Sequence, residues 1–130
     1  MAEYEDYISR AEEALASAQI LLENQKFNSA MSEAYYCMFY SAKALLSFKD
    51  FHPKKHKGVL ALLGLEFVNK GYIEEVYGKI FAKNMQLREK ADYDVSFRAS
   101  EEEAKSMIDD ANRFLNRIKK AIEDFKKERK

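Results

Sequence analysis

The 130-residue sequence has few of the residues that build turns, with four glycines and a single proline. An all-β fold needs many tight turns, and tight turns favour glycine and proline, so this scarcity argues against a sandwich or a barrel. Cys37 is the only cysteine, and no disulfide can therefore form within the chain. Because Cys37 lies in an apolar stretch, we interpret it as a small core residue rather than a nucleophile.

The sequence also lacks a charge of one sign and a long apolar run. Its 22 basic residues balance its 22 acidic residues, which excludes a strongly basic coat for nucleic acid but leaves room for a local basic patch. No apolar run approaches the roughly 20 residues of a membrane helix, and the acidic start of the chain lacks the core of a signal peptide. We therefore expect a cytoplasmic protein that does not enter a membrane.

Familiar catalytic signatures are missing as well. The sequence has no glycine-rich phosphate loop, no nucleophile elbow and no Cys/His spacing typical of a metal site. His52 and His56 are four residues apart, but Pro53 separates them, so the two imidazoles need not share a helical face. We accordingly predict no metal and no cofactor.

What the sequence does contain is helical periodicity. Apolar residues recur at steps of three and four over five segments, which predicts amphipathic helices. The predicted helices span Glu3–Asn24, Ser29–Lys49, Gly58–Asn69, Ile73–Lys90, and a last helix that opens at a Ser100–Glu103 capping box and ends near Lys126. Long amphipathic helices joined by short connections pack as up-and-down bundles, so we expect an all-α bundle of four or five helices in one domain, residues 1–130.

The second predicted helix is apolar around most of its circumference, and Asn28 precedes it as the expected N-cap. A helix of this kind is covered on more than one side, so it is either the central helix of the bundle or also part of an oligomer interface. Its apolar surface exceeds what one bundle core should need, and we therefore expect a homodimer.

Charge is distributed unevenly along the chain. Residues 1–25 carry six acidic residues and one basic residue, whereas residues 113–130 carry eight basic and three acidic residues. The first helix and the end of the last helix could therefore lie side by side. The alternative is two separately solvated faces, which the weakness of exposed ion pairs favours.

Two segments outside the apolar stripes could contact a ligand. The segment 52–57 contains three lysines and two histidines, which offer donors and positive charge to a phosphate, although a solvated turn has the same composition. Arg88 lies near the expected end of a helix, and the following stretch ADYDVSFRA is predicted to be a loop. If the helix continues, Arg88 and Asp92 can form a structural salt bridge; otherwise the guanidinium could hold a phosphate, with Tyr93 stacking on a base.

The tyrosines Tyr35, Tyr36 and Tyr40 follow one another on the second predicted helix. Aromatic residues at helical spacing are usually part of a core. A buried tyrosine hydroxyl nevertheless needs a hydrogen-bond partner, so one or more of these side chains could point into a polar cleft.

Four short patterns, taken in order, resemble the HEPN domain family. The run AYYCMFYSA at 34–42, followed by Leu45 and Leu46, resembles the family's second helix, and KHKGV at 55–59 resembles its short histidine-bearing loop. Arg88 followed by ADY at 91–93 resembles a small bacterial and archaeal branch whose members are partners of minimal nucleotidyltransferases. The segment 101–115 is similar to the family's last helix.

The resemblance implies a helical bundle that dimerises around a cleft with an arginine near its base. Many family members pair with a small nucleotidyltransferase, often as a toxin–antitoxin module, and a tyrosine after the arginine can be modified by that partner. Others are metal-independent ribonucleases in which a histidine follows the arginine after four to six residues. Positions 92–95 of this chain are Asp, Tyr, Asp and Val, so the histidine that would serve best near neutral pH is missing.

Three hypotheses follow. The first is a dimeric subunit that binds a nucleotide or an RNA phosphate and pairs with a small nucleotidyltransferase; its expected binding residues are Tyr36, Lys55, His56, Lys57, Arg88 and Asp92. The second is a metal-independent endoribonuclease in which Arg88 stabilises the phosphorane and His56 or Tyr93 transfers protons. The third is a structural helical adaptor without a ligand.

Overall fold

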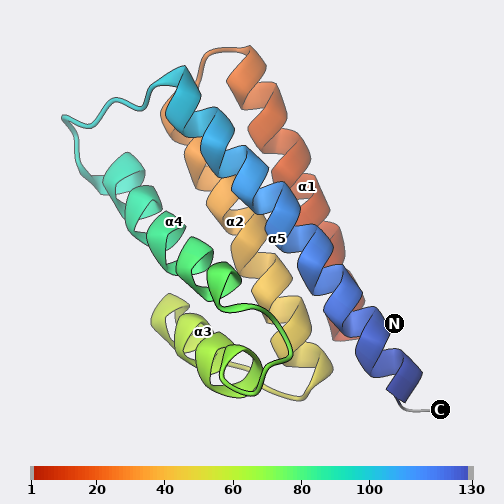
Figure 1. The fold of residues 1–130 in the computed structure, drawn as a ribbon. Helices are drawn as coiled ribbons and strands as arrows, with labels where there is room; N and C mark the ends of the chain where they lie inside the picture. The colour runs from red at the N-terminus through yellow and green to blue at the C-terminus, as the bar shows by residue number, and fades with distance from the viewer. Residues whose placement is uncertain (1, 129–130) are drawn as a thin grey trace.

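The computed structural model describes residues 2–128, and its elements are α1 (Glu3–Glu23), α2 (Phe27–Phe48), α3 (His56–Leu63), the π-helical turn η1 (Gly64–Val68), α4 (Glu75–Tyr93) and α5 (Glu101–Glu128). The long helices α1, α2 and α5 lie side by side, α4 runs along another side of α2, and α3 lies near the far end of α2 (Figure 1). The predicted all-α bundle is confirmed, and residues 2–128 contain no strand. None of the helices in this range is long and apolar enough to span a membrane.

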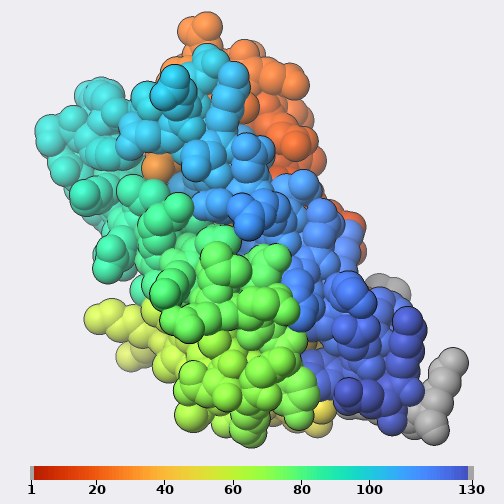
Figure 2. All heavy atoms as spheres, viewed as in Figure 1, coloured from red at the N-terminus to blue at the C-terminus, as the bar shows by residue number. Residues whose placement is uncertain are grey.

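Helix α2 is the centre of the bundle. Thirteen of its 22 residues are buried, and it packs against α1, α3, α4 and α5. In Figure 2 the surfaces of α4 and α5 cover most of it from one side. Cys37 lies in this core, where burial raises the pKa of its thiol to about 12, as expected for a packing residue. The chain itself therefore covers the apolar circumference of α2, and the homodimer stays a prediction.

Helices α1 and α5 are neighbours, which is the less favoured of the two interpretations of the charge distribution. Lys119 Nζ lies 2.6 Å from Glu12 Oε2, and Lys126 Nζ lies 5.2 Å from the ring centre of Tyr4. Both charged groups of the first pair are substantially exposed, so this pair adds little stability. The larger contribution comes from apolar packing, since the periodicity of the last predicted helix places eight apolar residues in one stripe and all eight are buried: Ala104, Met107, Ile108, Ala111, Leu115, Ile118, Ile122 and Phe125.

The prediction that Asn28 is the N-cap of α2 was wrong. The helix begins at Phe27, so Asn28 is already inside its first turn. Its side chain instead crosses to the loop before α5, where Nδ2 donates to the Phe97 carbonyl at 3.1 Å and Oδ1 accepts from the Ala99 amide at 2.8 Å. The Ser100–Glu103 capping box of α5 is confirmed, with its two reciprocal hydrogen bonds at 2.9 and 3.0 Å.

Helices α3 and α4 also differ from the prediction at their ends. Helix α3 begins at His56, two residues earlier than expected. Helix α4 runs on through Tyr93, so residues 91–93 are helical although the pattern ADYDVSFRA predicted a loop. The physical reason is that side chains stabilise this last turn, because Asp92 pairs with Arg88 one turn earlier and with Ser32 of α2.

Candidate functional site

The candidate site is built around Arg88, whose side chain points from α4 into the bundle and leaves only 6% of the residue exposed. Its Nη1 donates to Asp92 Oδ2 at 3.3 Å, one helical turn later. Asp92 also accepts a hydrogen bond from the hydroxyl of Ser32 on α2. The guanidinium is therefore held by a carboxylate that is itself fixed by a second helix.

Three tyrosine rings surround the same guanidinium. Arg88 Cζ lies 5.1 Å from the ring centre of Tyr35, 5.7 Å from that of Tyr36 and 6.0 Å from that of Tyr93. Such cation–π contacts stabilise a positive charge that has lost its water. Burial alone would lower the pKa of Arg88, but Tyr36 and Asp92 outweigh it, so its pKa is raised and the charge is retained.

The guanidinium still has capacity to donate. Its Nε is buried and finds no hydrogen-bond partner among residues 2–128. A buried donor without a partner costs roughly 1–3 kcal/mol, and more on a charged group. Arginine carries five N–H groups in a planar fork that matches phosphate oxygens. The Arg88 guanidinium therefore donates to one carboxylate and can donate to further acceptors.

His56, at the start of α3, belongs to this cluster. Its Nδ1 lies 2.8 Å from the hydroxyl oxygen of Tyr35, and its ring stacks on Phe39 with 4.3 Å between ring centres. Burial and then the charge of Arg88 lower the pKa of His56, so the imidazole is neutral near pH 7. Burial raises the pKa of Tyr35, and Arg88 opposes this only in part, so Tyr35 keeps its proton.

The arrangement brings together most of the residues expected from the sequence. Tyr36 and Asp92 contact the guanidinium, and Tyr93 covers it from the end of α4 while remaining 77% exposed. Lys55 and Lys57 are exposed on either side of His56, and within the part of the chain described neither side chain has a hydrogen bond or ion pair, so the structure does not join them to the Arg88 cluster.

Sequence reasoning missed the supporting residues of the cluster. It did not single out Ser32, and it assigned Tyr35 mainly to the core. The signal for both is weak, because Ser32 meets Asp92 across 60 residues of sequence and Tyr35 meets His56 across 21. No group of three or more His, Cys, Asp or Glu side chains that could hold a metal occurs in residues 2–128.

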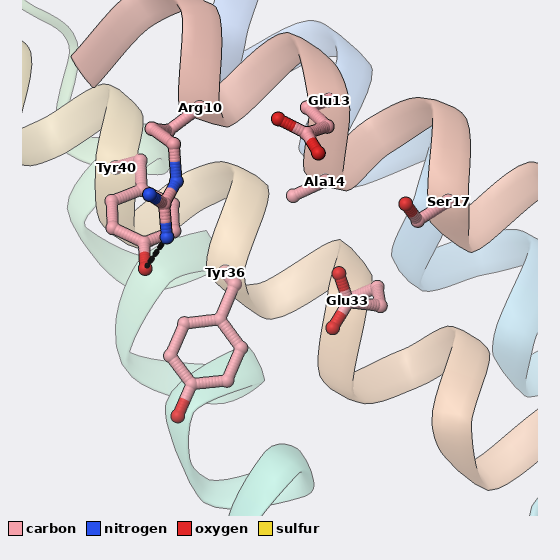
Figure 3. A pocket seen from close by; sticks show the side chains of 7 residues that line it. All are labelled: Arg10, Glu13, Ala14, Ser17, Glu33, Tyr36 and Tyr40. Carbon is pink, nitrogen blue, oxygen red and sulfur yellow. Dashed lines mark hydrogen bonds between the residues drawn. The ribbon is translucent and has the colours of Figure 1, made fainter. Parts of the chain in front are cut away.

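A pocket of about 440 Å³ opens between α1 and α2 on the far side of Tyr36 (Figure 3). Tyr40 forms part of its wall, with Arg10 Nη2 donating to the Tyr40 hydroxyl at 3.4 Å and Arg10 Cζ 5.2 Å from the ring centre. Glu13 and Glu33 point into the same space from α1 and α2. Of the three tyrosines of α2, Tyr35 is therefore buried, whereas Tyr36 and Tyr40 border this pocket.

Comparison with known proteins identifies the family. The chain is 51% identical over 123 residues to a protein of Methanocaldococcus jannaschii named "Putative toxin", covering 95% of this chain and 91% of that protein. It is 39% identical to a UPF0332 protein of Thermotoga maritima, covering 91% and 89% of the two chains.

A solved structure agrees in fold. The crystal structure of TT1696 from Thermus thermophilus superposes with a TM-score of 0.79 over 93% of this chain and 99% of that one. At 18% identity this similarity shows the fold alone. The profile of the HEPN domain matches residues 4–122. The chain therefore belongs to the HEPN domain family.

Proposed function

We propose that this HEPN-family chain binds the phosphate of a nucleotide or of RNA at Arg88, as a subunit that pairs with a small nucleotidyltransferase in a toxin–antitoxin-like module. The observation that carries the proposal is the buried guanidinium, which retains its charge beside one carboxylate and has a donor without a partner. A phosphate oxygen is the acceptor that its planar fork suits best.

Each neighbour of Arg88 then has a role. Asp92 and Ser32 hold the guanidinium in place, and the faces of Tyr36 and Tyr93 offer stacking surfaces beside it. Lys55 and Lys57, exposed at the start of α3, add positive charge around the approach to the site.

The partner and the dimer rest on a second observation. Tyr93 and Val95 are 77% and 89% exposed next to the Arg88 cluster, and large apolar side chains exposed together are typical of a protein interface. We place the contact with a second copy or with the nucleotidyltransferase at this end of α4, where the exposed Tyr93 hydroxyl is accessible for modification. The relatives named "Putative toxin" support a module of this type.

A specific observation also favours a metal-independent endoribonuclease as a second candidate function. His56 is neutral near pH 7, and the Tyr35 hydroxyl joins it to the Arg88 cluster. In this alternative His56 takes the proton of a ribose 2′-hydroxyl as its oxygen attacks phosphorus, and Arg88 stabilises the charge that develops on the phosphate oxygens. The P–O5′ bond breaks, which leaves a 2′,3′-cyclic phosphate, and the departing 5′-oxygen takes a proton from the Tyr93 hydroxyl or from water.

One experiment tests both candidates. Wild type and Arg88→Ala, matched in helical circular dichroism and native mass, are titrated into a fluorescein-labelled pool of single-stranded RNA in chelator. Binding is read by anisotropy and cleavage on a denaturing gel. Intact RNA bound by wild type alone supports the binding subunit, and cleavage by wild type alone supports the nuclease. Equal binding by both proteins contradicts the assignment of Arg88, and no binding by either supports the adaptor.

The pairing is tested separately by co-purification. The tagged chain is expressed with the small nucleotidyltransferase encoded beside its gene, where there is one, and we expect a stable complex with Tyr93 modified. Loss of the complex in Val95→Asp, with Leu65→Asp at an exposed position of η1 as the matched control, would locate the interface. A complex that neither substitution disturbs would place it elsewhere.

A further inference from the structure

The pocket between α1 and α2 combines flat surfaces with two acceptors. Figure 3 shows Arg10 and Tyr40 together on one side, the ring of Tyr36 below, and the carboxylates of Glu33 and Glu13 pointing into the space from α2 and α1. Its volume of about 440 Å³ is within the range of small-ligand pockets.

The two carboxylates lack partners of opposite charge. Neither Glu13 nor Glu33 forms an ion pair within residues 2–128, and Glu33 is half-buried beside Tyr36, three residues away on the same helix. Burial raises the pKa of Glu33, and the charges of Asp92 and Glu13 raise it further, as expected for an acceptor without a donor. A ligand that supplies N–H donors would satisfy it.

The stacking surfaces favour a flat ligand over a second cation. A lysine or arginine from a partner protein would also suit carboxylates and tyrosine faces. However, the guanidinium of this chain's own Arg10 already lies over Tyr40, and it would repel another positive charge. A nucleobase can stack against Tyr36 and against the Arg10–Tyr40 pair without this repulsion.

Among the nucleobases, guanine is the one whose hydrogen-bond donors match the carboxylates. An ionised carboxylate only accepts hydrogen bonds, so it matches a base edge that offers two donors side by side. Guanine offers two, the N1–H and the N2 amino group, whereas adenine and cytosine place a ring-nitrogen acceptor beside their amino group. Uracil places its one N–H between two carbonyl groups.

The pocket also adjoins the phosphate site. Tyr36 borders it, and the same ring lies 5.7 Å from Arg88 Cζ. We propose that the pocket between α1 and α2 binds the guanine base of a nucleotide or RNA whose phosphate lies on Arg88, with Glu33 as the main acceptor and Glu13 as the second. This inference rests on the proposed function, because it takes Arg88 as the phosphate site.

The test is calorimetric titration of the full chain with GMP, AMP, CMP and UMP, in chelator and near neutral pH. We expect GMP to bind about tenfold more tightly than the others, since a well-placed bidentate contact discriminates by that order. Glu33→Gln replaces one acceptor with an amide donor and should reduce the preference to less than about threefold. Glu23→Gln, an exposed acid near the end of α1, is the matched control and should leave the preference unchanged.

The outcomes separate this inference from the proposed function. Nucleotides that bind without preference, but not to Arg88→Met, would overturn the guanine pocket and leave the phosphate site standing. Selective binding of GMP whose affinity Arg88→Met does not weaken would support the pocket and contradict the phosphate site.

Three other results would overturn the guanine pocket. The first is a preference that survives both Glu33→Gln and Glu13→Gln. The second is binding of N-acetyl-arginine amide, in place of GMP, that depends on Glu33. The third is binding of no nucleotide by a folded wild type, and in that case the RNA titration described above decides the proposed function independently.

Discussion

Two partly or fully buried arginines of this chain, Arg88 and Arg117, are arranged in opposite ways. Arg117 of α5 donates from Nε to Glu74 Oε1 at 2.7 Å and from Nη2 to the Tyr72 carbonyl at 3.0 Å, so its fork ties α5 to the turn before α4. Arg88 bonds to Asp92 on its own helix and otherwise faces tyrosine rings. Each guanidinium has one buried nitrogen without a partner among residues 2–128, Nε of Arg88 and Nη1 of Arg117. The difference lies in the hydrogen bonds that they make: Arg117 donates to another segment of the chain, whereas Arg88 donates only within its own helix.

This difference teaches how a structural arginine can be distinguished from a ligand-binding one. Hydrogen bonds from Arg117 satisfy a backbone carbonyl and a carboxylate that would otherwise be left to solvent, and they therefore contribute to folding. Apolar residues in place of both Arg88 and Asp92 would often be neutral for stability, so the pair itself is weak evidence for a structural role. The positive charge of Arg88 is better explained by what it binds.

The largest effect we expect is on RNA binding by Arg88→Met. Removing the guanidinium should weaken binding roughly 100-fold, as for a charged hot spot, because both the charge and the planar fork are lost. The free energy of unfolding should change by less than about 1 kcal/mol, because Asp92, left without its cation, is 28% exposed to solvent and keeps the hydrogen bond from Ser32. Anisotropy titrations and urea denaturation measure the two quantities on the same sample.

Arg117→Met should lower the stability of the protein and leave its RNA binding almost unchanged. It leaves the Tyr72 carbonyl and Glu74 without their donor, and we expect a loss of about 1–2 kcal/mol in the free energy of unfolding and a fall of several degrees in Tm. Because Glu74 is 62% exposed and Tyr72 is 45% exposed, water replaces part of these bonds, and the loss should be at the lower end of this range. RNA binding should stay within about twofold of wild type. If both arginine variants lost binding and stability together, the comparison would fail.

A smaller effect is expected from Ser32→Ala, which removes the hydroxyl that fixes Asp92 but leaves the Arg88 charge in place. Binding should weaken roughly twofold to fivefold, because Asp92 then holds the guanidinium less firmly. Stability should hardly change, since alanine is favourable in a helix. Ser29→Ala, exposed three residues earlier on α2, is the control; an equal loss in both variants would contradict the role of Ser32.

The same contrast explains how much could be predicted from the sequence. Helical periodicity located the bundle and all eight residues of the α5 stripe, because packing repeats every three or four residues. Periodicity could not predict the hydrogen bonds of Asn28 to the backbone of residues 97–99, and it ended α4 before residues 91–93. Contacts between side chains far apart in the sequence determine both features. Propensity describes only the local chain.

The candidate site was predictable in part for the same reason. Arg88 and Asp92 are four residues apart, and this spacing alone allows the pair once the helix is known to continue. The position of His56 relative to Arg88 depends on how α3 packs against α2, which no local pattern specifies. The pocket between α1 and α2 had no signal, because no local pattern connects Glu13 and Glu33, which lie on different helices.

The smallest effect concerns the pH dependence of stability, and it tests whether His56 belongs to the Arg88 cluster. Its folded-state pKa is lowered from the ordinary 6.5, so below that pH the unfolded chain binds more protons and the folded protein loses stability as pH falls through this window. The slope from one such group is at most about 1.4 kcal/mol per pH unit. His56→Gln should therefore flatten the fall in Tm between about pH 7 and pH 5. His52→Gln, at the exposed surface near Glu3, should leave the fall in Tm unchanged. The difference between the two variants cancels the titration of Glu33, whose raised pKa acts in the opposite direction.

Introducing Arg88→Met as well should reduce the effect of His56→Gln, because the charge of Arg88 is one of the causes of the lowered pKa of His56. An unreduced effect would mean that burial alone is responsible, and that His56 and Arg88 act independently.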